Sequence, residues 1–223
     1  VAINKADGKT LWQNHNDEAG YSSPVLLRTG SLQHVVFFTG QRALAVDPRD
    51  GRLLWSYNRA SNRTAHIATP VVRGNRVFFS SAYGTGAGMV QVRAAGAIAA
   101  AEEMYFTRDM RNHHSSSVLV GDTLYGYSDS ILTALDFDTG ELAWRSRSIG
   151  KGSLIYADQR LYLYSERGTV GLADASPAAY NERGRFAIPA DSGSPTWSHP
   201  IITNGKLILR DQDNVFAFDV GAR

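Results

Sequence analysis

Apolar and polar residues alternate along this chain in short runs, the pattern of half-buried β-strands. Five such runs read VVFFTG, RVFFSS, LYGYS, LYLYS and LILRD. A shorter apolar strand and a tight turn precede each one, and these shorter strands read SSPVLL, ATPVVR, SSSVLV, GSLIYA and SHPIIT. The shorter strands recur at intervals of 36 to 47 residues. This regular spacing predicts a repeated unit of several short antiparallel strands.

A longer motif recurs three times and joins two further strands of each unit. It runs from Ala2 to Trp12, from Ala45 to Trp55 and from Ala134 to Trp144, with its glycine at Gly8, Gly51 and Gly140. We expect the Asn or Asp two residues after each alanine to cap a tight turn, in which the glycine adopts a positive φ. The tryptophan is a large apolar plate suited to packing one unit against the next.

The two patterns together predict an all-β fold, a β-propeller of four-stranded antiparallel blades. Residues 1–223 form one domain in this layout: 1–15 supply the outer strands of a first blade, 20–58, 66–108, 113–148 and 152–187 are blades, and 196–223 are a last blade without its fourth strand. We favour about five blade equivalents of a seven- or eight-bladed parent with upstream blades. Alternatively, the first strands complete the last blade in a five-bladed ring.

One segment departs from strand composition. Residues 92–106, VRAAGAIAAAEEMYF, are rich in Ala and Glu but stand where a turn and an outer strand belong. We expect a degenerate blade edge here, with a short helical turn.

Composition narrows the function classes. The net charge is +2 and the arginines form no basic stripe, so we expect no nucleic-acid partner. No apolar stretch reaches the roughly 18 residues of a transmembrane helix. The absence of cysteine excludes disulfides and thiolate metal sites.

Candidate chemistry gathers in the loops that lead into each blade's first strand, residues 13–23, 58–69, 107–116, 147–152 and 188–199. These loops hold about a quarter of the chain but five of its six histidines. In a propeller they line the mouth of the central channel, together with the loops between second and third strands. We therefore predict a ligand site from Tyr21, Arg63, His66, Tyr83, Asn112, His113, His114, Lys151, Trp197 and His199. The alternative is that these side chains only satisfy crowded backbone groups.

Other chemistries fit the sequence less well. The glycine-rich loop Ala82–Gly88 precedes a strand rather than a helix, which disfavours phosphate binding. The adjacent His113 and His114 point apart in an extended chain, and Asp211 and Asp213 lack the rest of a calcium loop, so we predict no metal site. Nothing fixes a Ser–His–Asp triad, so we assign no catalytic residue.

The Ala, Asp, Gly and Trp repeat resembles the tryptophan-docking motif of the quinoprotein alcohol dehydrogenases. The whole chain is similar to exported bacterial proteins of the pyrroloquinoline-quinone-like (PQQ-like) propeller family, which includes the outer-membrane-assembly propeller lipoprotein. The resemblance implies a periplasmic or secreted protein and a structural role for Trp12, Trp55 and Trp144. The dehydrogenases carry a vicinal cysteine pair beside the quinone, which this chain lacks.

We therefore expect a non-enzymatic binding or scaffolding module with an unidentified small-molecule or protein partner. The alternative is a quinoprotein alcohol or sugar dehydrogenase domain that holds PQQ with calcium.

Overall fold

The computed structural model describes residues 1–189 and 192–221, and these residues form strands and no helix. The chain divides into two compact units, Val1–Arg111 and Asn112–Arg223. We describe each unit by itself.

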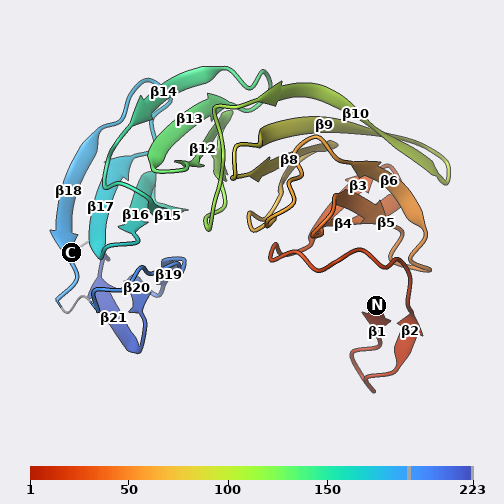
Figure 1. Ribbon diagram of the computed structural model, residues 1–223, viewed down its shortest axis with the longest axis horizontal. Helices are drawn as coiled ribbons and strands as arrows, with labels where there is room; N and C mark the ends of the chain where they lie inside the picture. Colours follow the sequence, from red (N-terminus) through yellow and green to blue (C-terminus); the bar gives the residue numbers. More distant parts are fainter. Residues whose placement is uncertain (190–191, 222–223) are drawn as a thin grey trace. The chain divides into compact units, whose positions relative to one another are not determined.

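The first unit contains three antiparallel sheets (Figure 1). The first is the pair β1 (Ala2–Ile3) and β2 (Thr10–Trp12). The second pairs β3 (Val25–Thr29), β4 (Leu32–Phe38), β5 (Ala43–Val46) and β6 (Leu53–Tyr57) in chain order. The third pairs β7 (Val71–Arg73), β8 (Arg76–Ser81), β9 (Gly86–Ala95) and β10 (Ile98–Thr107), also in chain order.

The core of the first unit lies between its two four-stranded sheets. Val36, Ala45 and Trp55 from one sheet are buried in a single cluster with Phe79 and Val90 from the other. Phe79 meets Trp55 edge-on, with 6.5 Å between ring centroids. Alternate residues of β4, β5, β8 and β9 point into this cluster, as the apolar alternation predicts.

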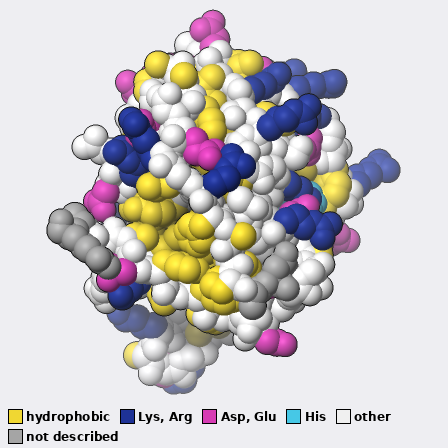
Figure 2. Space-filling view, turned by 90° about the vertical axis from the view of Figure 1, so that its left-hand side faces the viewer, with side chains coloured by type: hydrophobic (Ala, Val, Ile, Leu, Met, Phe, Trp, Pro, Cys, Tyr) yellow, Lys and Arg dark blue, Asp and Glu magenta, His cyan; other side chains and the backbone are white. Residues whose placement is uncertain are grey.

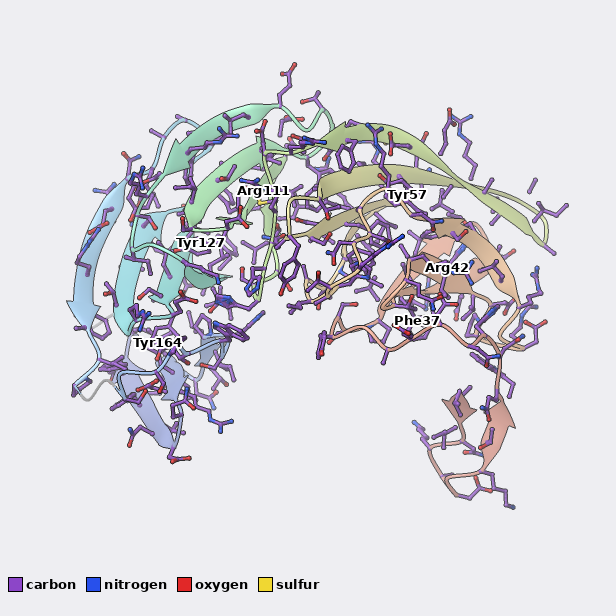
Figure 3. The ribbon with its side chains drawn as sticks, viewed as in Figure 1. Phe37, Arg42, Tyr57, Arg111, Tyr127 and Tyr164 are labelled. Carbon is purple, nitrogen blue, oxygen red and sulfur yellow. The ribbon has the colours of Figure 1, made fainter. Side chains whose placement is uncertain are left out.

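The segment before β3 is fixed to the first four-stranded sheet by polar contacts. Arg42 donates two hydrogen bonds to Asp17, at 2.8 and 3.0 Å, and Figure 3 shows Arg42 together with Phe37 of β4. His15 Nε2 lies 2.8 Å from the carbonyl of Gly51. The Arg42 guanidinium holds the pKa of Asp17 below its usual value, so this ion pair is present at neutral pH.

The second unit repeats the same architecture (Figure 1). One sheet pairs β11 (Val118–Val120), β12 (Thr123–Ser128), β13 (Ile131–Asp136) and β14 (Leu142–Ser146). The next pairs β15 (Gly152–Ala157), β16 (Arg160–Ser165), β17 (Thr169–Asp174) and β18 (Glu182–Ala187). The last pairs β19 (Ile201–Thr203), β20 (Lys206–Asp211) and β21 (Asn214–Asp219).

Two apolar clusters hold the sheets of the second unit together. Tyr125, Tyr127 and Trp144 pack with Leu161 and Leu163 of the following sheet. A second cluster joins that sheet to the three-stranded one, and it is built from Tyr162, Tyr164, Val170, Ile188, Leu207 and Leu209. Figure 3 shows Tyr127 on β12 and Tyr164 on β16, one from each cluster.

The three repeat turns have one conformation, as the sequence predicts. Gly8, Gly51 and Gly140 have φ of 72°, 73° and 73°. In each turn the glycine N–H donates to the carbonyl of the Asn or Asp four residues earlier, at 2.8 to 2.9 Å. The side chain of that same residue accepts a hydrogen bond from the backbone two residues on, at 2.9 to 3.0 Å.

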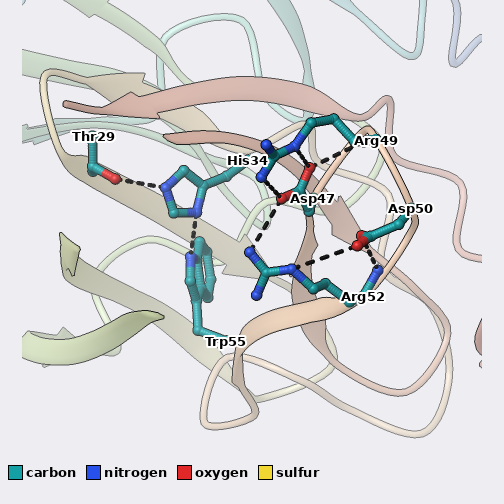
Figure 4. Close-up of polar contacts among 7 residues, drawn as sticks. All are labelled: Thr29, His34, Asp47, Arg49, Asp50, Arg52 and Trp55. Carbon is teal, nitrogen blue, oxygen red and sulfur yellow. Dashed lines mark hydrogen bonds and ion pairs between the residues drawn. The ribbon is translucent and has the colours of Figure 1, made fainter. Parts of the chain in front are cut away.

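The repeat tryptophans contact the turn of the following sheet in two of the three cases. Trp12 Nε1 donates to the Pro48 carbonyl at 2.9 Å, and Trp144 Nε1 donates to the Ser176 carbonyl at 2.9 Å. Trp55 instead donates to Nδ1 of the fully buried His34 at 3.2 Å, and His34 Nε2 lies 2.6 Å from Thr29 Oγ1 (Figure 4). His34 is therefore protonated on Nε2, because its Nδ1 accepts the indole N–H.

The third sheet of the first unit explains why Trp55 differs, and it corrects one expectation. The structure has no helical turn within residues 92–106, where β9 and β10, each of ten residues, form a hairpin joined by Gly96 and Ala97. Gly96 has a φ of 61°, as a two-residue hairpin turn with glycine first requires. Strand pairing thus overrides the helix propensity of the Ala-rich run. Trp12 and Trp144 each donate to the connection between the third and fourth strands of the following sheet, and after Trp55 this connection is the tip of a long hairpin.

The expectation of an all-β protein made of four-stranded antiparallel sheets is confirmed. The predicted blade boundaries and the single domain stay a prediction. Residues 222 and 223 of the predicted last blade lie outside the described residues.

Candidate functional site

Four predicted site residues lie in the first unit. His66 is fully buried and stacks on Phe38 with 4.3 Å between ring centroids. Its Nε2 accepts a hydrogen bond from the Asn62 N–H at 2.7 Å, and its Nδ1 donates to the Thr39 carbonyl. Both ring nitrogens thus serve backbone groups, and burial holds the pKa of His66 below its usual value. His66 therefore fixes the loop through both ring nitrogens, and its predicted role in ligand binding stays a prediction.

The other three predicted residues of this unit lie at its surface. Tyr21 and Tyr83 are exposed over 76% and 48% of their surface, and Arg63 is also exposed. The Tyr21 N–H donates to the His66 carbonyl at 2.9 Å.

In the second unit, Asn112 has a structural environment like that of His66. It is buried, its Nδ2 donates to the Tyr127 carbonyl at 3.1 Å, and its Oδ1 accepts from Ser117 at 2.9 Å. These bonds fix the loop that carries the next two residues, His113 and His114.

Five predicted residues of the second unit come together. His113, His114 and Trp197 form a three-ring cluster with centroid separations of 5.4 to 5.6 Å. His114 is stacked on the indole with an interplanar angle of 27°, whereas His113 stands edge-on to both rings. The Lys151 ammonium lies 5.8 Å from the indole centroid. His199 joins through its Nε2, which lies 2.8 Å from the carbonyl of His114.

Glu166 completes the cluster, and sequence reasoning missed it. Its carboxylate lies 3.4 Å from the Lys151 ammonium and accepts the Trp197 Nε1–H at 3.2 Å. Its backbone N–H donates to the Lys151 carbonyl, and its carbonyl accepts from the Thr196 N–H. The signal was present in the sequence, since Glu166 directly follows the strand LYLYS in a loop on the same edge of the sheet.

The loops bring these groups together because each one precedes or follows a strand at the same end of its sheet. His113 and His114 precede β11, Lys151 precedes β15, and Trp197 and His199 precede β19. Hydrogen bonds from Thr196 and Ser198 to the Arg210 carbonyl, at 2.9 and 2.7 Å, fix the last loop. Residues 190 and 191 of that predicted loop lie outside the described residues.

Trp197 offers an accessible face to a ligand. It is exposed over 54% of its surface although it is stacked on His114 and hydrogen-bonded to Glu166. Beside it lies a hollow of about 250 Å³, which is lined by Thr196, Trp197, Ser198, Arg210 and Gln212. The site can therefore present an aromatic plate, a hydrogen-bonding rim and the Lys151–Glu166 ion pair on one surface.

His114 differs from the other buried histidines in this structure. It is 5% exposed, and neither of its ring nitrogens makes a hydrogen bond to any residue that the structure describes. Burial, together with the neighbouring His113 and Lys151, lowers the pKa of His114 from 6.5 to about 4. At neutral pH the cluster therefore contains a neutral, buried imidazole whose polar atoms are desolvated without compensation.

The described side chains do not fit the PQQ and calcium of the dehydrogenase alternative. Calcium takes six to eight oxygen ligands, several of them carboxylates. Within residues 1–189 and 192–221, no three His, Cys, Asp or Glu side chains lie close enough together to hold a metal ion. The vicinal cysteine pair of those enzymes has no counterpart, because the chain has no cysteine.

Comparison with known proteins defines the relationship. The family model described as "Outer membrane protein assembly factor BamB" matches residues 1–146. The chain belongs to this family. Among curated proteins, no match was found.

Solved structures show the fold. BamB from Moraxella catarrhalis is 17% identical, with a TM-score of 0.65 over 94% of this chain and 61% of that one. The quinohemoprotein alcohol dehydrogenase ADHIIG from Pseudomonas putida HK5 is 14% identical, with a TM-score of 0.65 over 94% of this chain and 42% of that one. Saccharomyces cerevisiae Sqt1 is 13% identical, with a TM-score of 0.69 over 99% of this chain and 65% of that one.

These similarities confirm the PQQ-like β-propeller fold that the repeat predicts. The chain spans less than two thirds of the length of each of these three proteins. Its described residues contain no helix long and apolar enough to cross a membrane.

Proposed function

We propose that this chain is a non-enzymatic binding or scaffolding module of the bacterial envelope. Its binding surface is the loop cluster of the second unit, formed by His113, His114, Lys151, Glu166, Trp197 and His199. The partner is a protein or small molecule that covers the exposed face of Trp197.

One observation carries the proposal: the buried His114 imidazole, which makes no hydrogen bond to a described residue, is stacked on the half-exposed Trp197 indole. A buried polar group without partners costs about 1–3 kcal/mol, and such local costs concentrate at functional sites. His114 has this cost on both ring nitrogens. It also fixes the Trp197 indole by stacking, while Glu166 fixes the same ring from its edge. A rigid aromatic anchor with a polar rim is typical of binding hot spots.

The chemistry of the cluster favours binding over catalysis. A general base works best with a pKa near the working pH, whereas the pKa of His114 is about 4. The nearby serines are engaged elsewhere, since Ser115 donates to the Ser116 carbonyl and Ser117 to Asn112. No hydroxyl among the described residues is therefore hydrogen-bonded to His114 as a nucleophile would be.

The relatives support the same assignment. The family description names an outer membrane protein assembly factor, which agrees with a binding or scaffolding role for this chain. Membership also supports a periplasmic or extracellular location. The second candidate function, a quinoprotein dehydrogenase domain, is favoured by the structural similarity to the alcohol dehydrogenase ADHIIG.

Site-specific photo-crosslinking in the native host tests the proposed surface. A benzophenone amino acid at position 197 should give a discrete adduct, and intact mass spectrometry separates a protein adduct from a small-molecule one. The same probe at Tyr156, which is 37% exposed on β15, is the matched control. We expect the Lys151→Ala variant to reduce the adduct at position 197. Equal adducts at both positions, or none at position 197, would contradict the proposal.

A further inference from the structure

The register of the sheets shows where the repeat tryptophan belongs in every blade. Ala2 is paired with Trp12, Ala45 with Trp55 and Ala134 with Trp144, and in each sheet the register shifts beside this pair. The sheet β15–β18 has the same irregularity, between Leu172 and Ala173.

In that sheet the partner of Leu172 is Gly184. Glycine therefore occupies, in β18, the position at which β2, β6 and β14 each carry tryptophan. In β10 the corresponding residue is Tyr105, which is paired with Met89. Four of the five strands thus place a large aromatic side chain at this position, and β18 places none.

A hollow lies where that indole would be. It has a volume of about 310 Å³, belongs entirely to the second unit, and is lined by Tyr162, Leu172, Gly184, Phe186, Leu207 and Val220 among others. A Cβ atom added to Gly184 would meet nothing within 4 Å. An apolar cavity of about 150 Å³ is enough to bind benzene. Figure 2 looks onto this side of the second unit, where hydrophobic side chains gather at the surface.

The rim of the hollow also repeats the polar contact of the tryptophan. The Trp12 N–H donates to the carbonyl of Pro48, the residue directly after the turn residue Asp47. Val220 stands at the equivalent place, directly after Asp219, and lines the hollow. The Gly221 N–H donates to Asp219 Oδ1 at 3.2 Å, as the Arg49 N–H donates to Asp47 Oδ1 at 3.0 Å. By correspondence with Trp12, the Val220 carbonyl is the expected acceptor for an indole N–H, although the acceptor of Trp144, Ser176, stands two residues after Asp174 rather than one.

We propose that this hollow is a second binding site, for a free small molecule of the indole class: planar, bicyclic, uncharged and with one N–H donor. Trp12 and Trp144 fill the corresponding space against the following sheet, and each donates its indole N–H to a backbone carbonyl there. Phe186 lines the hollow and offers an aromatic ring on which such a ligand can pack; Phe218, 4.8 Å from it between centroids, holds this ring in place. The site shares no residue with the cluster around His114, so it goes beyond the proposed function.

Calorimetric titration with indole tests the proposal, and a substitution at Gly184 is the decisive variant. Gly184 has no positive φ, so its backbone accepts other residues. We expect one saturable indole site in the wild-type protein and at least tenfold weaker binding in Gly184→Trp, whose side chain fills the hollow. The thermal midpoint of that variant should rise by about 4 °C or more. The matched control Gly184→Ala should keep binding within a few-fold, because a methyl group leaves most of the volume open.

Three further arms keep the test decisive. N-methylindole has no N–H to donate to the Val220 carbonyl, so it should bind at least tenfold more weakly than indole. Gly184→Leu replaces Gly184→Trp if the latter does not fold, and should also weaken binding. Absence of saturable indole binding, or equal binding by Gly184→Trp, would overturn the proposal. So would selective binding of a tryptophan-containing peptide in place of free indole, because the occupant would then be a partner's side chain.

Discussion

Replacing His114 by phenylalanine should stabilise the protein, which is unusual for a substitution at a buried polar residue. The imidazole is 5% exposed, and its two nitrogens have no hydrogen-bond partner among the described residues. Phenylalanine is also a planar ring, and it can keep the stacking on Trp197. The change therefore removes two desolvated polar atoms and breaks no hydrogen bond of the His114 side chain.

The size of the effect follows from the cost of each buried atom. An unsatisfied buried nitrogen costs about 1–3 kcal/mol. Phenylalanine is slightly larger than histidine, so overpacking offsets part of the stabilisation that comes from removing these nitrogens. We therefore expect the free energy of unfolding at pH 8 to rise by about 2 kcal/mol.

The pH dependence gives a second, independent signature. The pKa of His114 is lowered in the folded protein from 6.5 to about 4. Below pH 6.5 the unfolded chain therefore binds a proton that the folded protein does not bind, and stability falls until pH 4. Between pH 6.5 and pH 5 this residue alone costs about 2 kcal/mol. His114→Phe lacks this loss, so its advantage over the wild type should grow to about 4 kcal/mol at pH 5.

Urea denaturation at pH 8 and pH 5, followed by circular dichroism, measures both quantities. His66→Phe is the matched control, because His66 is equally buried but bonds to the backbone of Asn62 and Thr39 through both nitrogens. It should destabilise the protein at pH 8. The reasoning is refuted if His114→Phe is destabilising at pH 8, or if its stability falls between pH 8 and pH 5 as steeply as that of the wild type.

Three further substitutions test the architecture by urea denaturation. Trp144→Ala should lower the free energy of unfolding by about 3–5 kcal/mol, as for other buried aromatic residues, and a loss below 1 kcal/mol would show that the indole contributes little to the packing of the sheets. Gly88→Ala would place its Cβ atom 1.9 Å from the Tyr57 hydroxyl and should cost about 2 kcal/mol; a neutral result would mean that Tyr57 moves freely. Asp47→Asn should lower the free energy of unfolding by about 1–2 kcal/mol at pH 7, because Arg49 holds the pKa of this buried carboxyl far below its usual value. The stability that the charge contributes is lost as the pH falls below about 4, so the wild type and the variant should differ less at pH 3.

The parts of the fold that were predictable from sequence are those set by local chemistry. Asp47 and Gly51 define a turn through the backbone between them, so five consecutive residues are enough to recognise it. The β9–β10 hairpin was not predictable, because its Ala and Glu residues favour a helix when taken alone. Pairing with β8 determines the outcome, and that depends on residues elsewhere in the chain.

The candidate site, like the fold, was predictable only where residues close together in the sequence decide the outcome. The sequence placed His66 and His114 in equivalent loops, but their roles depend on neighbours remote in the chain. His66 meets the Thr39 carbonyl, 27 residues away, whereas His114 meets the ring of Trp197. Gly184 could not be recognised from the sequence as the counterpart of a tryptophan. The loop before β18 is longer than the other repeat turns, and it lacks the glycine by which the three motif copies are aligned.

The most direct test of the central claim, that this is a binding module rather than a dehydrogenase, is reconstitution of the intact protein with PQQ and calcium. Bound quinone is measured after gel filtration, and dye reduction is followed with a mixture of alcohols and sugars. We predict no retained PQQ and dye reduction at the background rate. One PQQ retained per chain, with calcium-dependent dye reduction on adding an alcohol or sugar, would contradict the account.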